Sequence, residues 1–292
     1  MNNPVSHVSA VPVGATSPQP VIGRLLVEAG KLAPADIERI LILQKEKQLR
    51  FGEAALKLGA VEAIDVQHAL ARQFDYCFLR PEAGGLAPEL QAAYRPFGRE
   101  MEAMRSLRAR LVRSWFQCGR SELALAGVSQ GDGVSLMAAN LAVMFAQQGD
   151  RTLLVDANLR TPRQYAIFNL RNRRGLADIL AGRAGLESVA ALDIIPSLSV
   201  LCAGTPAPNP QELLSRRRFD ALRERLRSQY DVVLYDTPAL ATADDALVVA
   251  ACTGGLLVVA RRHRTTVRDM QALGTQLHAG GIAVAGAVLN EF

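Results

Sequence analysis

The stretch GVSQGDGVSLMAANLAVMFAQQGDRTLLVDANLRTP, residues 127–162, decides the fold of this chain. A glycine-rich loop separates a predicted strand from a long apolar helix, which is the arrangement of a phosphate-binding loop. Such loops carry a lysine before a Ser or Thr, but here the chain reads Gly133, Val134, Ser135. The loop is therefore predicted to hold phosphate through backbone amides at a helix N-terminus, without the usual lysine.

Short apolar segments alternate with amphipathic ones from Arg99 onward. The predicted strands are 122–128, 151–157, 198–204, 231–238, 254–261 and 284–290, and the predicted helices are 99–116, 135–149, 218–230 and 266–281. This alternation predicts an α/β fold with a parallel twisted sheet of the P-loop NTPase type, preceded by a small all-α domain. Ligands of such sheets bind at the carboxyl ends of the strands.

Two of these strands end on an aspartate, Asp156 and Asp236, and Ser135 stands where a hydroxyl would ligate Mg²⁺. A single such aspartate could merely cap a turn, but the three elements in chain order favour a nucleotide site. The aspartates are the predicted catalytic residues, and with Ser135 the predicted metal ligands. The predicted nucleotide-binding residues are Gly131, Asp132, Gly133, Val134, Ser135, Leu136 and Asn290.

Residues 99–292 resemble the bacterial tyrosine kinases of polysaccharide export, within the partitioning-type P-loop ATPases. The resemblance rests on 131–168, on NPQELL at 209–214, on DVVLYDTPA at 231–239 and on the spacing of Glu102, Arg105 and Arg108. It implies a tyrosine autokinase of exopolysaccharide biosynthesis and chain-length control that binds ATP or ADP with Mg²⁺. It also implies homo-oligomers that pack through the helix bearing those three residues, and a membrane chain-length determinant (polysaccharide co-polymerase) as partner.

Several positions depart from the family pattern. Val134 replaces the lysine, and losing such an electrostatic group commonly costs about 10² to 10³ in rate; its apolar side chain is expected to face phosphate. Asn158 stands where the family usually has aspartate, and Leu136 where threonine is common. No tyrosine cluster follows the last strand, which closes on VLNEF. Whether the chain is an active enzyme stays open. Tyr94 in the linker is the expected exposed acceptor, and the alternative is that its side chain packs.

The N-terminal part divides into three predicted segments. Residues 1–18 are predicted as a disordered tail, 19–80 as a helical domain, and 81–98, rich in Pro and Gly, as a linker to the P-loop domain at 99–292. Segments 21–44 and 50–73 match at an offset of 29 residues, so each copy predicts a short helix, a glycine turn and a longer helix.

This repeat resembles the N-terminal domain of type II secretion and type IV pilus ATPases, some of which bind cyclic di-GMP. The alternative is a helical docking module whose glycines serve tight turns. Val21 stands in the first copy where the second has Arg50, which removes one cation. The positions that the resemblance implies for the ligand are Gly23, Leu26, Gly30, Gln44, Arg50, Gly52, Gly59 and Gln73.

Arginine carries almost all of the positive charge in a chain of net charge +5. The lysines are Lys31, Lys45, Lys47 and Lys57, and none follows in the P-loop half. A cation that replaces the missing lysine must therefore be an arginine, a lysine of the N-terminal region or a group of another chain. The candidate arginines are Arg160, Arg163 and the cluster at 171–174.

Two other functions stay open. A partitioning-type ATPase could bind DNA or membrane through the basic runs at 215–219 and 260–268, although such runs are usually solvated surface and no nucleic acid is expected. A cyclic di-GMP sensor could use the P-loop domain as a scaffold. Scattered cysteines and no basic segment before an apolar run indicate a cytoplasmic location, with recruitment to the inner membrane by a partner.

Overall fold

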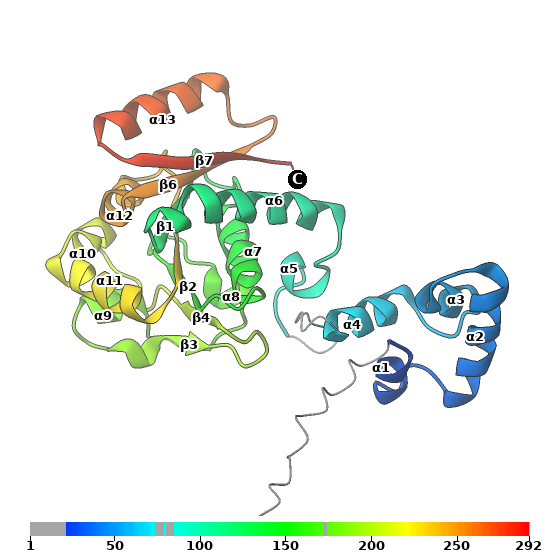
Figure 1. Cartoon of the computed structure of the whole chain (residues 1–292). Helices are drawn as coiled ribbons and strands as arrows, with labels where there is room; N and C mark the ends of the chain where they lie inside the picture. Colours follow the sequence, from blue (N-terminus) through cyan, green and yellow to red (C-terminus); the bar gives the residue numbers. More distant parts are fainter. Residues whose placement is uncertain (1–21, 74–78, 80–84, 172–173, 292) are drawn as a thin grey trace, which may run out of the picture. The chain divides into compact units, whose positions relative to one another are not determined.

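The computed structural model describes residues 22–73, 79, 85–171 and 174–291. The chain divides into two compact units, Met1–Tyr76 and Cys77–Phe292 (Figure 1). The tail predicted over 1–18 lies outside the described residues. No helix in the described ranges is long and apolar enough to cross a bilayer.

The first unit contains α1 (Ile22–Glu28), α2 (Pro34–Lys47), α3 (Phe51–Lys57) and α4 (Ala63–Gln73). These are the two pairs of short and long helices that the repeat predicts. α1 packs on α4 and α3 on α2, so each short helix packs against the long helix of the other copy. Because each copy completes the core of the other, the two copies form one folding unit.

The repeat glycines serve this packing. Gly30 and Gly59 both have φ +65°, which favours glycine at the turn that follows each short helix. A Cβ on Gly23 would lie 3.0 Å from Phe51, and one on Gly52 would lie 2.8 Å from Val66. The glycines therefore serve turns and helix packing within the unit, while docking and cyclic di-GMP binding both stay predictions.

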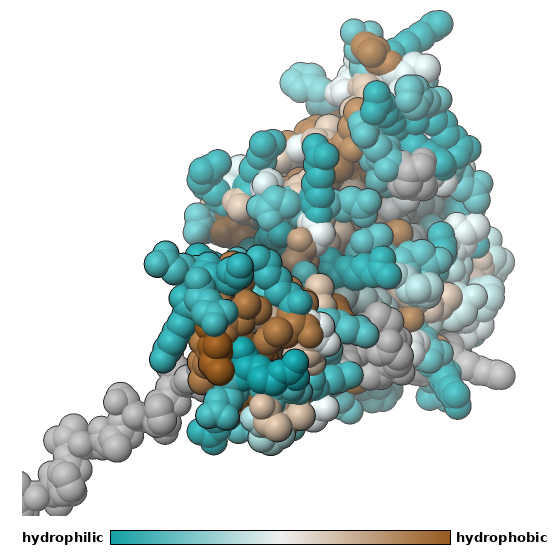
Figure 2. Space-filling model, turned by 90° about the vertical axis from the view of Figure 1, so that its right-hand side faces the viewer, coloured by the Kyte–Doolittle hydropathy of each residue, from teal (hydrophilic) through white to brown (hydrophobic). Residues whose placement is uncertain are grey.

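Apolar side chains also gather on the face shown in Figure 2. The large apolar residues exposed in the first unit are Leu41, Ile42, Leu56, Leu58 and Leu70. Leu41 and Leu70 are equivalent positions of the repeat, so both copies present leucine to solvent at the same place.

The second unit is built on a seven-stranded sheet in the order β3-β4-β2-β5-β1-β6-β7. All neighbouring pairs are parallel except β3 with β4, which is antiparallel. The strands are β1 (Glu122–Gly127), β2 (Thr152–Asp156), β3 (Ala190–Ala191), β4 (Leu198–Leu201), β5 (Val232–Asp236), β6 (Gly255–Arg261) and β7 (Ala283–Asn290). The predicted parallel α/β sheet is confirmed, with the short edge strand β3 in addition.

Helices cover both faces of this sheet (Figure 1). Leu123 and Leu125 of β1 face one apolar cluster while Ala124 and Ala126 face the other, as alternating side chains of a strand must. The first cluster includes α5 (Gln91–Tyr94), α6 (Arg99–Ser114), α7 (Val134–Ala146) and α8 (Gln164–Ile167); the second includes α9 (Leu176–Leu180), α10 (Pro210–Leu214), α11 (Arg217–Gln229), α12 (Asp245–Thr253) and α13 (Val267–Ala279). Two 3₁₀ turns, η1 (Phe116–Cys118) and η2 (Leu186–Ser188), complete the elements.

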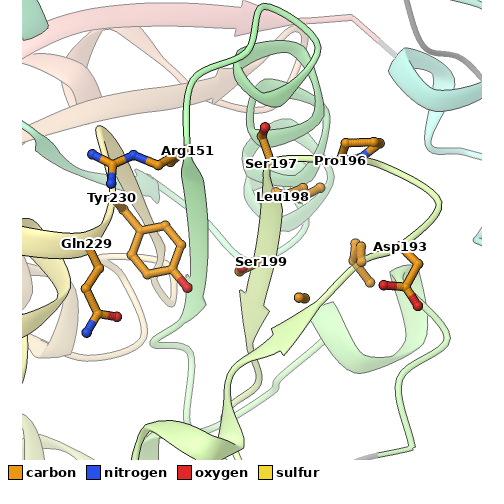
Figure 3. Close-up of a pocket in the computed structure, with 10 residues that line it drawn as sticks. Arg151, Asp193, Pro196, Ser197, Leu198, Ser199, Gln229 and Tyr230 are labelled. Carbon is orange, nitrogen blue, oxygen red and sulfur yellow. The ribbon is translucent and has the colours of Figure 1, made fainter.

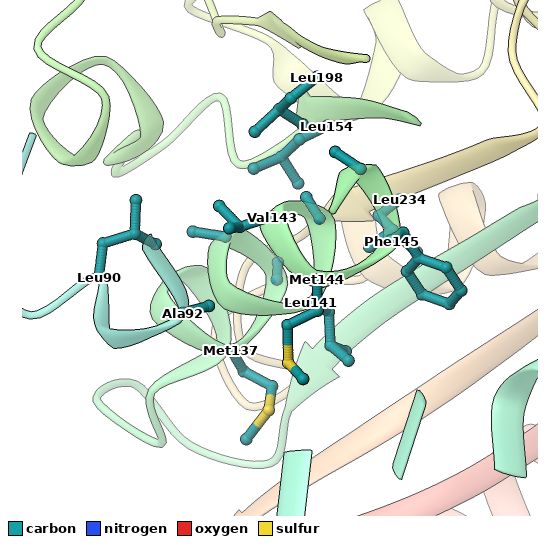
Figure 4. Packing of buried hydrophobic residues seen from close by; sticks show 14 of the residues in the cluster. Leu90, Ala92, Met137, Leu141, Val143, Met144, Phe145, Leu154, Leu198 and Leu234 are labelled. Carbon is teal, nitrogen blue, oxygen red and sulfur yellow. The ribbon is translucent and has the colours of Figure 1, made fainter. Parts of the chain in front are cut away.

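Residues 85–98 belong to the second unit, which differs from the linker expected over 81–98. Leu90 and Ala92 pack beside α7 in the apolar cluster (Figure 4). The backbone N–H of Ala92 donates to Asn140 Oδ1 at 2.8 Å, and Gln147 Nε2 donates to the Ala92 carbonyl at 2.8 Å. The prolines and glycines of this segment mark turns, whereas its leucines and alanines attach it to α7.

A buried ionic network stands at the amino end of β1. The Glu122 carboxylate accepts hydrogen bonds from Arg223 Nη2 at 2.7 Å, from Arg223 Nε at 3.1 Å and from the Tyr235 hydroxyl at 2.7 Å. Burial, reinforced by the Glu122 charge, raises the pKa of Tyr235 well above its ordinary value. Trp115 Nε1 donates to the Glu122 carbonyl at 2.8 Å, so the single tryptophan lies beside this network.

We expect Glu122→Ala to lower the free energy of unfolding of the second unit by about 3 to 5 kcal/mol, because it leaves Arg223 buried without its main partner. Tyr235→Phe should cost only about 1 kcal/mol, since Arg223 still satisfies Glu122. Urea unfolding followed by Trp115 fluorescence measures both. Glu224→Ala, which removes an exposed pair with Arg227, is the control and should change little. The assigned role would be contradicted if Glu122→Ala unfolded with the same urea midpoint as the wild type.

Candidate functional site

The loop 128–133 joins β1 to α7 at the carboxyl edge of the sheet. Gly131 has φ +88° and Gly133 has φ +89°, so both positions favour glycine. Asp132 is fully buried, and its Oδ2 accepts the backbone N–H of Ser129 at 2.8 Å. The loop thus closes on itself and leads directly into the first turn of α7, where backbone amides point out of the helix.

Asp156 and Asp236 lie side by side at the same carboxyl edge of the sheet as this loop. They end the neighbouring strands β2 and β5, are direct register partners, and have no exposed surface. Burial, and then the charge of Asp236, raises the pKa of Asp156 well above its ordinary value. Burial raises the pKa of Asp236 to about 6 despite hydrogen bonds from the Gln164 and Ser135 side chains. The predicted pair is therefore brought together at a cost in charge repulsion and desolvation.

Gln164 orients both carboxyl groups and was not predicted from the sequence. Its Nε2 donates to Asp236 Oδ2 at 2.7 Å and to the Ser135 carbonyl at 3.0 Å, and its backbone N–H donates to Asp156 Oδ2 at 3.0 Å. It is fully buried at the start of the four-residue helix α8. The only sequence signal was a polar residue next to an apolar segment, which is too common to single it out.

Three buried oxygens at the site have no hydrogen-bond partner among the described residues: Asp132 Oδ1, Gln164 Oε1 and Asp236 Oδ1. Buried polar atoms are normally satisfied, so such a group indicates an absent ligand or water. Two buried carboxyl groups with raised pKa values next to a serine are suited to a cation. Mg²⁺ commonly takes one or two carboxylates and completes its shell with phosphate and water, so Ser135, Asp156 and Asp236 fit it.

Val134 does not face the phosphate position as expected. Its side chain is only 8% exposed and belongs to the first apolar cluster, the one that includes α5, α6, α7 and α8. The side chain follows the inward face of α7 because it is apolar. The neighbouring Leu136 is half-buried in the same first turn.

Asn158 caps the loop that follows β2. Its Oδ1 accepts the backbone N–H of Thr161 at 3.0 Å, and its own N–H donates to Asp156 Oδ1 at 3.2 Å. Asparagine thus serves the local turn where the family usually has aspartate.

The candidate substitute cations differ in availability. Arg160 is committed to buried Asp245 through two hydrogen bonds of 2.7 and 3.0 Å, which removes it from the candidates. Arg163 is exposed, and its backbone N–H donates to Asp156 Oδ2 at 3.1 Å. Arg171 and Arg174 are exposed, while 172–173 lie outside the described residues.

Arg261, which the sequence argument missed at this site, reaches the loop from β6, and the predicted residue Asn290 reaches it from β7. Arg261 Nη1 donates to the Gly131 carbonyl at 3.1 Å, and Asn290 at the end of β7 donates from Nδ2 to the Asp132 carbonyl at 3.0 Å. The run 260–268, read as a DNA-facing or solvated surface, therefore touches the phosphate-binding loop. Arg261 and Gly131 are 130 residues apart, so the sequence gave no signal of their contact.

The α6 residues expected at an oligomer interface make bonds within the chain. Arg105 pairs with Glu102 and donates to the Pro96 carbonyl, while Arg108 Nη1 donates to the Met144 carbonyl on α7 at 2.9 Å. The arginines thus fasten α6 to its own unit, and the role of this helix between subunits stays a prediction.

Tyr94 is not an exposed acceptor. It is 5% exposed, and its hydroxyl is bonded to the backbone N–H of Leu86 at 2.9 Å and to its carbonyl at 3.1 Å. Tyr235 is buried as expected, and Tyr76 lies outside the described residues. Tyr165 on α8 is 51% exposed and follows Gln164 directly.

A cavity of about 570 Å³ lies elsewhere, at the amino ends of β2 and β4 (Figure 3). Arg151, Ser197 and Tyr230 are among its lining residues, and Arg151 is already paired with Asp231 at 2.7 Å. None of the predicted site residues lines it, so it is separate from the carboxylate pair.

We expect Asp236→Asn to stabilise the metal-free protein above about pH 6. The folded-state pKa of about 6 lies above the ordinary value of 3.8, so wild-type stability falls as pH rises from about 4 through 6. The difference should reach on the order of 3 kcal/mol at pH 8 and vanish near pH 4. Urea unfolding with EDTA, followed by Trp115 fluorescence across pH, measures it. If Asp236→Asn were less stable than the wild type at pH 8, the result would show that other groups already stabilise the charged form of Asp236.

Known proteins share this architecture. The family model described as cellulose biosynthesis protein BcsQ matches residues 120–279. Tyrosine-protein kinase wzc of Salmonella typhi is 35% identical over 203 residues, which cover 70% of this chain and 28% of that protein. The chain spans about a quarter of the length of the curated relatives it matches.

Two solved structures are similar over most of their own length. The kinase domain of Escherichia coli tyrosine kinase ETK has a TM-score of 0.68 and 30% identity, covering 73% of this chain and 84% of that one. The chimerical protein CapA2B2 has a TM-score of 0.66 and 30% identity, covering 76% and 97%. By these matches the chain belongs to the P-loop family that the BcsQ model describes and to the bacterial tyrosine kinases.

Proposed function

We propose that this chain binds a magnesium–nucleotide complex at the loop 128–133 and works in exopolysaccharide assembly as a tyrosine-kinase-family protein. The observation that carries the proposal is the buried pair Asp156 and Asp236, with Asp236 Oδ1 unpartnered among the described residues, in front of a glycine loop and a helix N-terminus. The names of the relatives, tyrosine kinases and a cellulose biosynthesis family, support the assignment.

Each group at the site has a distinct role in this proposal. Amides of the first turn of α7 bind phosphate oxygens. The Ser135 hydroxyl, Asp156 and Asp236 would hold Mg²⁺, which would supply neutralisation of phosphate charge when bound. Gln164 fixes the Asp236 carboxyl group through Oδ2 and leaves Oδ1 for the ligand. Asp156, which accepts hydrogen bonds from three backbone N–H groups, would be the second carboxylate that holds the ion.

Phosphoryl transfer should be slow because Val134 provides no charge to the phosphates. Nucleotide binding depends on the amides and on the metal ligands, which remain. The proposed chain is therefore a nucleotide-binding member of its family in which transfer is weakened by about 10² to 10³.

The proposed setting is a homo-oligomer that acts with a membrane chain-length determinant at the inner face of the membrane. This partner is the one that the family resemblance implies, and a location in the cytoplasm follows from it. α6 is the proposed contact between subunits, since Glu102 is exposed there beside Arg105.

We expect wild-type protein to bind MgADP and MgATP in calorimetric titrations, and Val134→Lys to raise transfer of the γ-phosphate by about 10²-fold. Val134→Met is the matched control, because it is similar in length and flexibility but uncharged. If Val134→Lys and Val134→Met transferred the γ-phosphate at equal rates, the missing charge at position 134 would not be the cause of slow transfer. Binding by Val134→Lys alone would mean that the native chain is a scaffold that has lost its nucleotide.

We expect the phosphate transferred by Val134→Lys to appear on Tyr165, the exposed tyrosine next to the site. Phosphopeptide mapping of Val134→Lys and of Val134→Lys with Tyr165→Phe measures this. Tyr94→Phe in the same background should leave the label unchanged because its hydroxyl is buried. Undiminished labelling without Tyr165 would place the acceptor elsewhere in the chain.

A further inference from the structure

The phosphate-binding loop is surrounded by acidic side chains and contains no cation of its own. Asp132 is fully buried within the loop, and Asp156 and Asp236 end the neighbouring strands. Val134 packs into the apolar cluster, so it cannot offset phosphate charge. A nucleotide polyphosphate at this loop therefore calls for a cationic side chain from outside the loop, in addition to the metal.

The turn that joins β6 to α13 is fastened to the outer side of this loop. Arg261 bonds the Gly131 carbonyl at 3.1 Å. The backbone N–H of Arg262 bonds the carbonyl of Asn290 at 2.9 Å, and the Asn290 side chain bonds the Asp132 carbonyl at 3.0 Å. These contacts engage carbonyl oxygens of the loop, whereas phosphate binding uses its amides, so the turn and a phosphate can contact the loop together.

Arg264 belongs to this turn and places its guanidinium against Gly131. Its Nη1 lies 2.8 Å from the position that a Cβ on Gly131 would occupy. Its side chain is exposed, and within the described residues no hydrogen bond or ion pair engages this guanidinium. By contrast, Arg262 in the same turn is paired with Glu291 at 3.0 Å. Arg264 is therefore a positioned and uncommitted cation at the loop.

We propose that Arg264 binds the phosphates of a nucleoside di- or triphosphate and supplies, for binding, the countercharge that a loop lysine would otherwise supply. This inference rests on the proposed nucleotide binding. A guanidinium presents a planar fork of donors that matches phosphate oxygens, and its charge persists at every physiological pH. The glycine at position 131 fits this role, because any side chain there would displace the guanidinium.

Titration of the full-length chain with MgADP and with adenosine, by calorimetry, tests the proposal. Arg264→Ala should weaken MgADP binding about ten- to hundredfold, the usual loss for a hydrogen bond to a charged group. Arg264→Lys should recover most of this loss. Arg262→Ala is the matched control from the same turn and should bind within about twofold of wild type. Adenosine should bind all four proteins equally, because it has no phosphate.

The outcomes separate this inference from the proposed function. If wild type does not bind MgADP, the nucleotide function fails and Arg264 fails with it. If wild type binds and Arg264→Ala binds equally well, only the role of Arg264 is overturned. Loss of affinity in Arg163→Ala with none in Arg264→Ala would assign the cation to Arg163, which precedes α8, instead. Wild-type far-ultraviolet circular dichroism and urea midpoints for each variant exclude misfolding as the cause.

Discussion

The structure of the P-loop unit depends on the burial of α7. Eleven of its thirteen residues are buried, because it packs on the sheet with one side and receives α5 and α6 on the other. A helix that is apolar nearly all round must be covered on every side. Because α7 must be covered, residues 85–98 pack against it, and the Val134 side chain points into the apolar cluster. The same burial also fixes the N-terminus of α7, and hence the phosphate-binding loop, at the carboxyl edge of β1.

Charge balance governs the site that α7 positions. Three buried carboxyl groups lie at or beside the loop, and two of them have raised pKa values because burial disfavours their charged form. Such an arrangement is costly in the absence of a cation and becomes favourable when a metal and phosphates complete it. The fold brings Arg261 of β6 and Arg264 of the following turn to this loop, where Arg264 is the proposed countercharge. The proposal thereby links binding to stability, since the groups whose burial is costly are those proposed to hold the ligand.

Much of the site follows from local sequence. The glycine loop, Ser135 and the two aspartates at strand ends were predictable because each lies at a fixed place in a strand–loop–helix pattern, and parallel strands bring their carboxyl ends to one edge. Gln164 and Arg264 were not predictable, because their side-chain contacts link segments 29 to 133 residues apart and no periodic pattern reports such contacts. Tyr94 was misjudged because Pro and Gly nearby indicated a linker, whereas burial depends on which surface the segment meets.

The sequence by itself determined the order of strands and helices, the tandem helical repeat and the absence of a lysine from the loop, since each is encoded in neighbouring residues. Only the tertiary structure decided where Val134 points, which tyrosines are exposed and which arginines are already paired. These properties depend on what lies across the fold from each side chain. Burial of Tyr94 in the cluster that surrounds α7, pairing of Arg160 with Asp245, and contact of Arg264 with Gly131 all join distant residues, so no local pattern could have determined them.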